Sequence, residues 1–155
     1  MSHHITIYTD GSARGNPGPG GYGIVFLMGN KMKEASEGFR HTTNNRMELL
    51  SVIVALETLK GHGHHVTIIS DSKYVVESIN QKWVWGWEKK NFKGKKNQDL
   101  WERFLEIYPK HHLKMQWVKG HADNPFNERC DVLAVTAATG GDLQIDHAYE
   151  ALPID

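Results

Sequence analysis

The order of apolar patterns along the chain restricts its fold more than any other feature. Ile5 and Ile7 alternate with polar residues up to Asp10, which is the two-residue period of a strand. The run NPGPGG at residues 16–21 is too rich in glycine and proline for a helix or a central strand, so it predicts a connection. The opening part therefore predicts an antiparallel meander of three strands: one ending at Asp10, one over 22–28 and one over 31–42.

The remainder of the chain alternates helical patterns with single strands. Residues 46–60 are apolar around most of a helical circumference, which predicts a helix buried on more than one side. Helical patterns also cover 72–81, 99–108 and 124–138, and short strands are expected at 64–70 and 113–117. This order predicts an α/β fold with a five-stranded mixed sheet, antiparallel at one edge and parallel in the remainder, flanked by helices.

The length of 155 residues predicts a single domain over 1–155, with a core of about 4–139 and an acidic tail at 140–155. The tail also carries apolar residues, so it could dock on the core or remain mobile. The single cysteine, Cys130, excludes an internal disulfide and is expected to be a packed thiol in a reducing compartment. No secretory segment and no run of roughly 20 apolar residues is visible, so we expect a cytoplasmic monomer with no membrane contact.

Charge is balanced overall, with 18 basic and 18 acidic residues, but it is unevenly distributed. Residues 82–96 contain six lysines against one acid, and aromatic residues are interleaved with the lysines. Such a segment is ordinarily a solvated amphipathic helix followed by a charged turn. The alternative is a surface that binds the phosphates of a nucleic acid.

Four acidic residues, Asp10, Glu48, Asp71 and Asp131, each lie beside a polar loop and next to an apolar element. Each has an ordinary structural explanation. Asp10 precedes a glycine and could belong to a turn, whereas Glu48 could form a capping box with Asn45. Asp71 could cap the helix that follows it, and Asp131 could be a solvated helix residue.

The neighbours of these acids favour a shared site. The positions three, four and seven residues beyond Glu48 and Asp131 are small or apolar: Ser51, Val52, Ala55, Ala134, Val135 and Ala138. Asp10 and Asp71 end strands, and they would emerge together if those strands are neighbours. Four converging carboxylates repel one another without a cation, and hard oxygen ligands favour Mg²⁺, for which Mn²⁺ can substitute. The chemistry that this predicts is phosphodiester cleavage with two metal ions.

Several blocks of the sequence, in the same order, resemble those of bacterial type 1 ribonuclease H. The blocks are DGS followed by NPGPGGYG, TTNNRMEL, DSKYV, and WVKGHA followed by NERCD, and the resemblance covers roughly residues 5–139. The resemblance implies the ribonuclease H-like fold and endonucleolytic cleavage of the RNA strand of RNA–DNA hybrids, without sequence preference. It implies 5′-phosphate and 3′-hydroxyl products, and Asp10, Glu48, Asp71 and Asp131 as the catalytic metal ligands. Nothing in the sequence indicates an obligate oligomer, so no obligate protein partner is expected.

The same resemblance implies roles for further residues. His121, on a Gly-flanked loop, matches a mobile catalytic histidine that handles protons or helps the product to leave. Asn16, Asn44 and Asn45 match positions that line the substrate groove, where amides can recognise 2′-hydroxyl groups. The backbone of Gly11 and Ser12 is expected beside the substrate as well, because it adjoins Asp10.

The lysine-rich segment falls where the family carries a basic protrusion that grips the phosphates of the DNA strand. The residues expected to bind the hybrid there are Trp83, Lys89, Lys90 and Lys93. Glu88 stands where the family often has lysine, Phe92 replaces a common tryptophan, and the loop before Asn97 is short. We therefore expect weaker hybrid affinity than in relatives with a longer protrusion.

Two alternative functions fit the sequence less well than an active hybrid-specific ribonuclease. A catalytically silent hybrid-binding module would tolerate loss of a metal ligand, yet all four acids are present. A DNA-cutting or strand-transfer enzyme of the wider superfamily would carry similar acids, but the asparagines, the basic segment and His121 favour the hydrolase.

The group His62, His64 and His65 looks like a metal cluster, but it lacks cysteine or helical spacing and is expected to be a loop.

Overall fold

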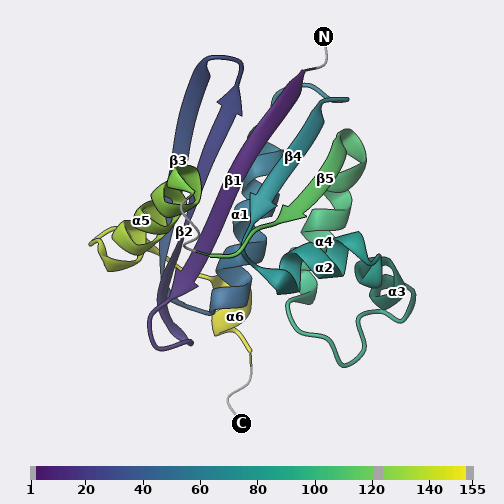
Figure 1. Cartoon of the computed structure of the whole chain (residues 1–155). Helices are drawn as coiled ribbons and strands as arrows, with labels where there is room; N and C mark the ends of the chain where they lie inside the picture. Colours follow the sequence, from purple (N-terminus) through teal and green to yellow (C-terminus); the bar gives the residue numbers. More distant parts are fainter. Residues whose placement is uncertain (1–2, 121–123, 153–155) are drawn as a thin grey trace.

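Six strands form one mixed sheet in the computed structural model, which describes residues 3–120 and 124–152 (Figure 1). The strands are β1 (His4–Ala13), β2 (Gly18–Met28), β3 (Lys31–Thr42), β4 (His65–Ser70), β5 (His112–Trp117) and β6 (Leu143–Gln144). Their order across the sheet is β5-β4-β1-β2-β3-β6. β1, β2 and β3 pair antiparallel, whereas β4 pairs parallel with both β1 and β5. The predicted mixed sheet is confirmed.

The number of strands was predicted wrongly, because the sheet has a sixth strand in the acidic tail. β6 pairs parallel with β3 through Gly38–Leu143 and Phe39–Gln144. Two residues are too few to show the alternation of a strand in sequence, so only the pairing with β3 reveals this one.

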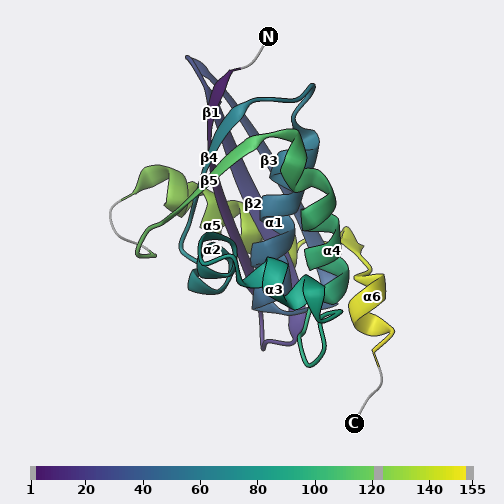
Figure 2. The ribbon, with the colours of Figure 1, turned by 90° about the vertical axis from the view of Figure 1, so that its right-hand side faces the viewer.

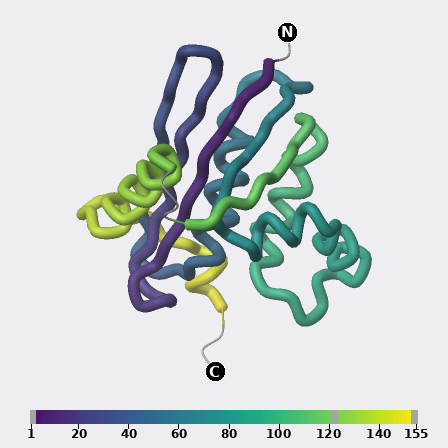
Figure 3. Tube along the Cα trace, in the orientation of Figure 1, coloured from purple at the N-terminus to yellow at the C-terminus, as the bar shows by residue number. Residues whose placement is uncertain are grey.

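Helices cover both faces of the sheet, as Figures 1 and 2 show from two sides. The helices are α1 (Asn44–Thr58), α2 (Lys73–Asn80), α3 (Trp83–Lys89), α4 (Gln98–Ile107), α5 (Pro125–Thr139) and α6 (His147–Glu150). α1 and α4 lie on one face, and α5 lies on the other. α5 packs mainly on β1, β2 and β3. Figure 3 traces the chain as it leaves β5 in the direction of α5.

α1 is the central helix of the core, as its apolar circumference predicts. Its buried residues include Leu49, Val52, Ile53 and Ala55, all with no exposed surface. They pack between the sheet and α4, where Trp101 is also fully buried. Each large side chain removed from water here contributes about 1.5–3 kcal/mol before the cost of ordering the chain, so α1 is held firmly against β1.

The acidic tail docks on the core as far as residue 152, which resolves the alternative left open by its sequence. The docking is polar as well as apolar, because Asp146 accepts hydrogen bonds from Arg46 Nε at 2.7 Å and from Thr42 Oγ1 at 2.8 Å. Asp146 also caps α6 by accepting from the Tyr149 N–H.

The single cysteine is packed in the core, as the sequence predicts. Cys130 is a fully buried free thiol whose Sγ donates to the Tyr8 carbonyl, and burial raises the pKa of this thiol. Within residues 3–120 and 124–152, no helix has the length and hydropathy needed to span a bilayer.

Candidate active site

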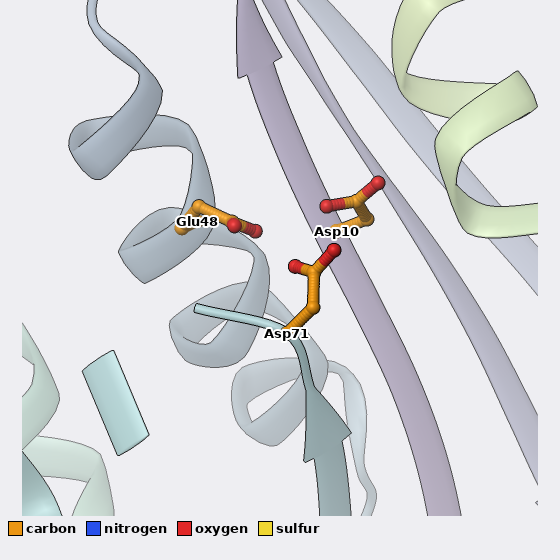
Figure 4. A group of neighbouring side chains, drawn as sticks. All are labelled: Asp10, Glu48 and Asp71. Carbon is orange, nitrogen blue, oxygen red and sulfur yellow. The ribbon is translucent and has the colours of Figure 1, made fainter. Parts of the chain in front are cut away.

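Three of the four predicted carboxylates meet at one end of the sheet. Asp10 lies in β1, Glu48 lies in the first turns of α1, and Asp71 directly follows β4. Each offers an oxygen within 4.8 Å of an oxygen from the other two, and Figure 4 shows the three side chains turned toward one another. The parallel pairing of β1 with β4 explains this arrangement, because the register Tyr8–Ile69 places the residues two positions further on side by side.

The position of Glu48 depends on a close approach between α1 and β1. A Cβ atom on Gly11 would lie only 2.4 Å from the backbone nitrogen of Glu48. Any side chain at residue 11 would therefore push α1 away from β1. Gly11 brings the helix near enough for Glu48 to reach Asp10.

Neither Glu48 nor Asp71 is a helix-capping residue, so two of the ordinary explanations fail. The N-cap of α1 is Thr43, whose hydroxyl accepts from the Arg46 N–H at 3.2 Å. The N-cap of α2 is Ser72, which accepts from the Val75 N–H at 3.2 Å. Both carboxylates are thus free for another role.

The electrostatics of the carboxylates favour the binding of a cation. Burial, followed by the negative charges of Asp71 and Asp131, raises the pKa of Asp10 from its usual 3.8 to about 8. Burial and the charges of Asp10 and Asp71 raise the pKa of Glu48 well above its usual value. These shifts describe the carboxylates alone, and an adjacent divalent cation would reverse their direction.

One oxygen of this group has no protein partner. Glu48 Oε1 is buried and accepts no hydrogen bond among the described residues, whereas Asp10 Oδ1 accepts the Gly11 N–H at 3.0 Å. A buried, unpaired carboxylate oxygen is costly, and a hard divalent cation is a suitable partner for it. The donor set of Asp10, Glu48 and Asp71 therefore fits Mg²⁺ or Mn²⁺.

The fourth carboxylate, Asp131, lies on α5 and is partly buried. Its charge contributes to the raised pKa of Asp10, but it is not one of the three residues whose oxygens converge. The small or apolar residues that follow Asp131 on the same helix face are only partly buried: Ala134 and Ala138 pack inward, whereas Val135 is 39% exposed.

The predicted catalytic histidine, His121, lies outside the described residues.

The predicted asparagines connect the loop after β1 to the start of α1. Asn16 Oδ1 accepts the Asn44 N–H at 3.0 Å, and Asn44 Oδ1 accepts the Ala13 N–H. Asn45 is exposed, and Ser12 and Gly11 pair with β2 next to Asp10. Asn16 and Asn45 line a groove of about 840 Å³. This groove also contains residues that were not predicted as site residues: Thr43, Lys95, Lys96 and Asn97.

The aromatic residues of the basic segment are mostly structural. Trp85 packs edge-on against Tyr108, Trp87 packs edge-on against Trp101, and Phe92 is buried. Trp83 is 46% exposed on α3. The three lysines predicted to bind phosphates are exposed: Lys89, Lys90 and Lys93. The segment therefore presents one tryptophan and a set of free lysines to solvent.

Comparisons with known proteins show the family to which the sequence is similar. The RNase H family model matches residues 2–139. The chain is 53% identical over 147 residues to a ribonuclease H of Desulforamulus reducens, covering 92% of each chain. It is 51% identical over 152 residues to a ribonuclease H of Pseudoalteromonas atlantica, covering 95% of this chain and 98% of that one.

Solved structures give the same result for the fold. LC9-RNase H1, described as a type 1 RNase H with the type 2 active-site motif, superimposes with a TM-score of 0.80 at 30% identity, covering 99% of this chain and 83% of that one. LC11-RNase H1, solved in complex with an RNA/DNA hybrid, gives a TM-score of 0.60 at 28% identity, covering 94% of this chain and 99% of that one. The chain therefore belongs to the ribonuclease H family, type 1.

Proposed function

We propose that this ribonuclease H hydrolyses the RNA strand of RNA–DNA hybrids endonucleolytically, with Asp10, Glu48, Asp71 and Asp131 as ligands of two Mg²⁺ ions. The observation that carries the proposal is the convergence of three carboxylates, one of which, Glu48, has a buried oxygen without a hydrogen-bond partner among the described residues. Bound cations supply activation of the attacking water and stabilisation of charge on the leaving oxygen. Hydrolysis with the 3′-oxygen as the leaving group leaves 5′-phosphate and 3′-hydroxyl ends.

The protein residues have separate tasks in this scheme. Asp10 and Glu48 come from the rigid core, since β1 and α1 are held together at Gly11. Asp71 approaches from the end of β4, where it is partly exposed. Asp131 adds negative charge from α5, and its charge already acts on Asp10. His121 is proposed as the auxiliary residue that handles protons.

Substrate recognition is proposed to divide between the asparagines and the lysines. The carbonyl oxygens of Asn16 and Asn44 are engaged with backbone N–H groups, which leaves their amide NH₂ groups to donate to 2′-hydroxyls of the RNA strand. Trp83, Lys89, Lys90 and Lys93 would contact the DNA strand. The lysine contacts go to phosphates and carry no sequence information, which supports cleavage without sequence preference.

The substrate assignment is tested with end-labelled RNA–DNA hybrid, duplex DNA and duplex RNA of the same sequence in Mg²⁺. The proposal predicts cleavage within the RNA strand of the hybrid and no cleavage of the two other duplexes. Cleavage of duplex DNA would indicate a different enzyme of the superfamily. Binding of the hybrid without cleavage would indicate a silent binding module.

A further inference from the structure

Trp117, the last residue of β5, contacts the backbone of the metal-site residue Asp71. Its indole Nε1–H donates to the main-chain carbonyl oxygen of Asp71 at 3.1 Å. The Trp117 side chain is 42% exposed, which is unusual for a residue that is normally well buried. Packing in the core therefore does not account for its position.

With this hydrogen bond, both polar groups of the peptide unit between Asp71 and Ser72 have a hydrogen-bond partner. The N–H of the same unit, from Ser72, donates to Ser70 Oγ at 3.0 Å. The carbonyl is held by Trp117 and the N–H by Ser70, so the peptide plane has little freedom to rotate. That plane fixes the backbone angle ψ of Asp71, and because the allowed side-chain rotamers depend on the backbone angles, it restricts the directions open to the Asp71 carboxylate.

The chain that leaves β5 lies directly against Asp71. Ser70 pairs with Trp117 in the parallel register, and the Val118 N–H donates to the Ser70 carbonyl at 3.0 Å. A Cβ atom on Gly120 would lie 2.7 Å from Asp71 Oδ2, so residue 120 approaches the carboxylate closely. Figure 4 shows the Asp71 carboxylate beyond the end of β4, turned toward Asp10 and Glu48.

A second contact holds the indole ring itself. Lys73 Nζ lies 4.9 Å from the centre of the Trp117 ring, which is the geometry of a cation–π interaction. Lys73 begins α2, two residues after Asp71. Trp117 therefore contacts the residues on both sides of Ser72: Asp71 through a hydrogen bond and Lys73 through the cation–π interaction.

We propose that Trp117 is a positioning residue for the metal site: its indole N–H orients Asp71 toward Asp10 and Glu48, and Lys73 keeps the indole in place. The need for such a contact follows from charge. Asp10 and Glu48 repel a third carboxylate, and the partly exposed Asp71 could otherwise turn toward solvent. The inference rests on the proposed function of these three carboxylates as Mg²⁺ ligands.

Trp117→Phe tests the proposal, because it keeps an aromatic face for Lys73 and removes the N–H donor. Mg²⁺ binding to the substrate-free protein, measured by an NMR titration, should weaken by about threefold to tenfold, the effect of one hydrogen bond. Lys73→Met should weaken it by about twofold, the effect of an exposed cation–π contact. Hybrid cleavage by Trp117→Phe should need more Mg²⁺, reach the wild-type kcat when Mg²⁺ is in excess, and show an unchanged KM for the hybrid.

A double-mutant comparison shows whether the effect passes through Asp71. In an Asp71→Asn background, Trp117→Phe should cause no further loss of Mg²⁺ affinity. Gln116→Ala, an exposed neighbour on β5, should bind Mg²⁺ like the wild type. Wild-type affinity in a folded Trp117→Phe protein, or an equal loss in the Asp71→Asn background, would overturn the inference. A wild-type protein that binds no Mg²⁺ would instead contradict the proposed function.

Discussion

Arg46 and Asp146, 100 residues apart in the sequence, form a buried ion pair in which Arg46 Nε lies 2.7 Å from Asp146 Oδ2. Their side chains are 3% and 10% exposed. Arg46 also donates to both carboxylate oxygens of Asp99 in α4, so a single guanidinium joins α1, α4 and the tail. Arg46 adjoins Asn45 in the groove, which links the docking of the tail to the shape of the predicted substrate surface.

Removing the tail carboxylate should destabilise the protein. We expect Asp146→Ala to lower the free energy of unfolding by about 2–4 kcal/mol, because it leaves Arg46 and Thr42 without a buried partner while Asp99 still neutralises part of the charge. Urea denaturation measures the change. Asp142→Ala, an exposed acid of the same tail, is the matched control and should have little effect. Equal stability of Asp146→Ala and wild type would show that the contacts of Asp146 with Arg46 and Thr42 contribute nothing.

Asp10→Asn should abolish activity and make the metal-free protein less sensitive to pH. The pKa of Asp10 is about 8 in the folded protein and lies near 3.8 when unfolded, so the folded state binds the proton more tightly. Wild-type stability in chelator should therefore fall as the pH rises between these two values, whereas that of Asp10→Asn should fall less. Thermal denaturation with EDTA at several pH values measures this. An Asp10→Asn protein that fails to fold would mean that the carboxylate is structural.

His111 should make the protein less stable in mild acid. His111 Nδ1 accepts the His64 N–H at 3.3 Å, while its buried Nε2 has no partner among the described residues. Burial, followed by the nearby charges of His64 and His62, lowers the pKa of His111. The unfolded chain then takes up a proton below about pH 6.5 that the folded state resists, so stability is present above that pH and is lost as the pH falls.

The variant His111→Asn separates this residue from the other histidines, because an asparagine oxygen can accept the same N–H without titrating. Its loss of stability between about pH 7.5 and about pH 5.5 should be smaller than that of the wild type. His112→Asn, at the exposed neighbouring position, should behave like the wild type. The same loss of stability in all three proteins would contradict the assignment.

The exposed lysines of the basic segment should determine how strongly salt weakens hybrid binding. Replacing Lys89, Lys90 and Lys93 by glutamine should raise KM and reduce the slope of log affinity against log salt by roughly one unit for each phosphate that is no longer neutralised. Because these lysines lie outside the carboxylate group, kcat should not change. An unchanged salt slope would show that the segment does not touch the hybrid.

Local sequence patterns predicted the helices and strands of the core. The features that the sequence did not predict depend on contacts between residues far apart in the chain. The alternation around Ile5 and Ile7 and the apolar helix at 46–60 were sufficient for β1 and α1. The alternative capping roles at the two helices could not be excluded from sequence, because Asn45 and Asp71 are as suitable as Thr43 and Ser72 by residue type alone. Only the backbone geometry distinguishes them.

The tail and the histidines show the same limit. β6 and α6 are too short to have a sequence pattern, and they are held by Arg46, whose partner lies 100 residues away. His64 and His65 were both expected in a loop, but only His64 precedes β4, whereas His65 is the first residue of that strand. The His64 ring stacks between His3 and His111, which local sequence does not indicate. The convergence of Asp10, Glu48 and Asp71 was predictable because each lies beside a recognisable helix or strand, although β1 continues past the predicted end at Asp10 to Ala13.

The most direct test of the metal site compares hybrid cleavage by the wild type and Glu48→Gln across a titration with Mg²⁺. Glutamine keeps the size of the side chain and removes the charge, so the fold should be retained. We predict cleavage of the RNA strand by the wild type only when Mg²⁺ is present, and a loss of at least about 100-fold in kcat/KM for Glu48→Gln. Cleavage by Glu48→Gln at the wild-type rate, or by the wild type in chelator, would contradict the account.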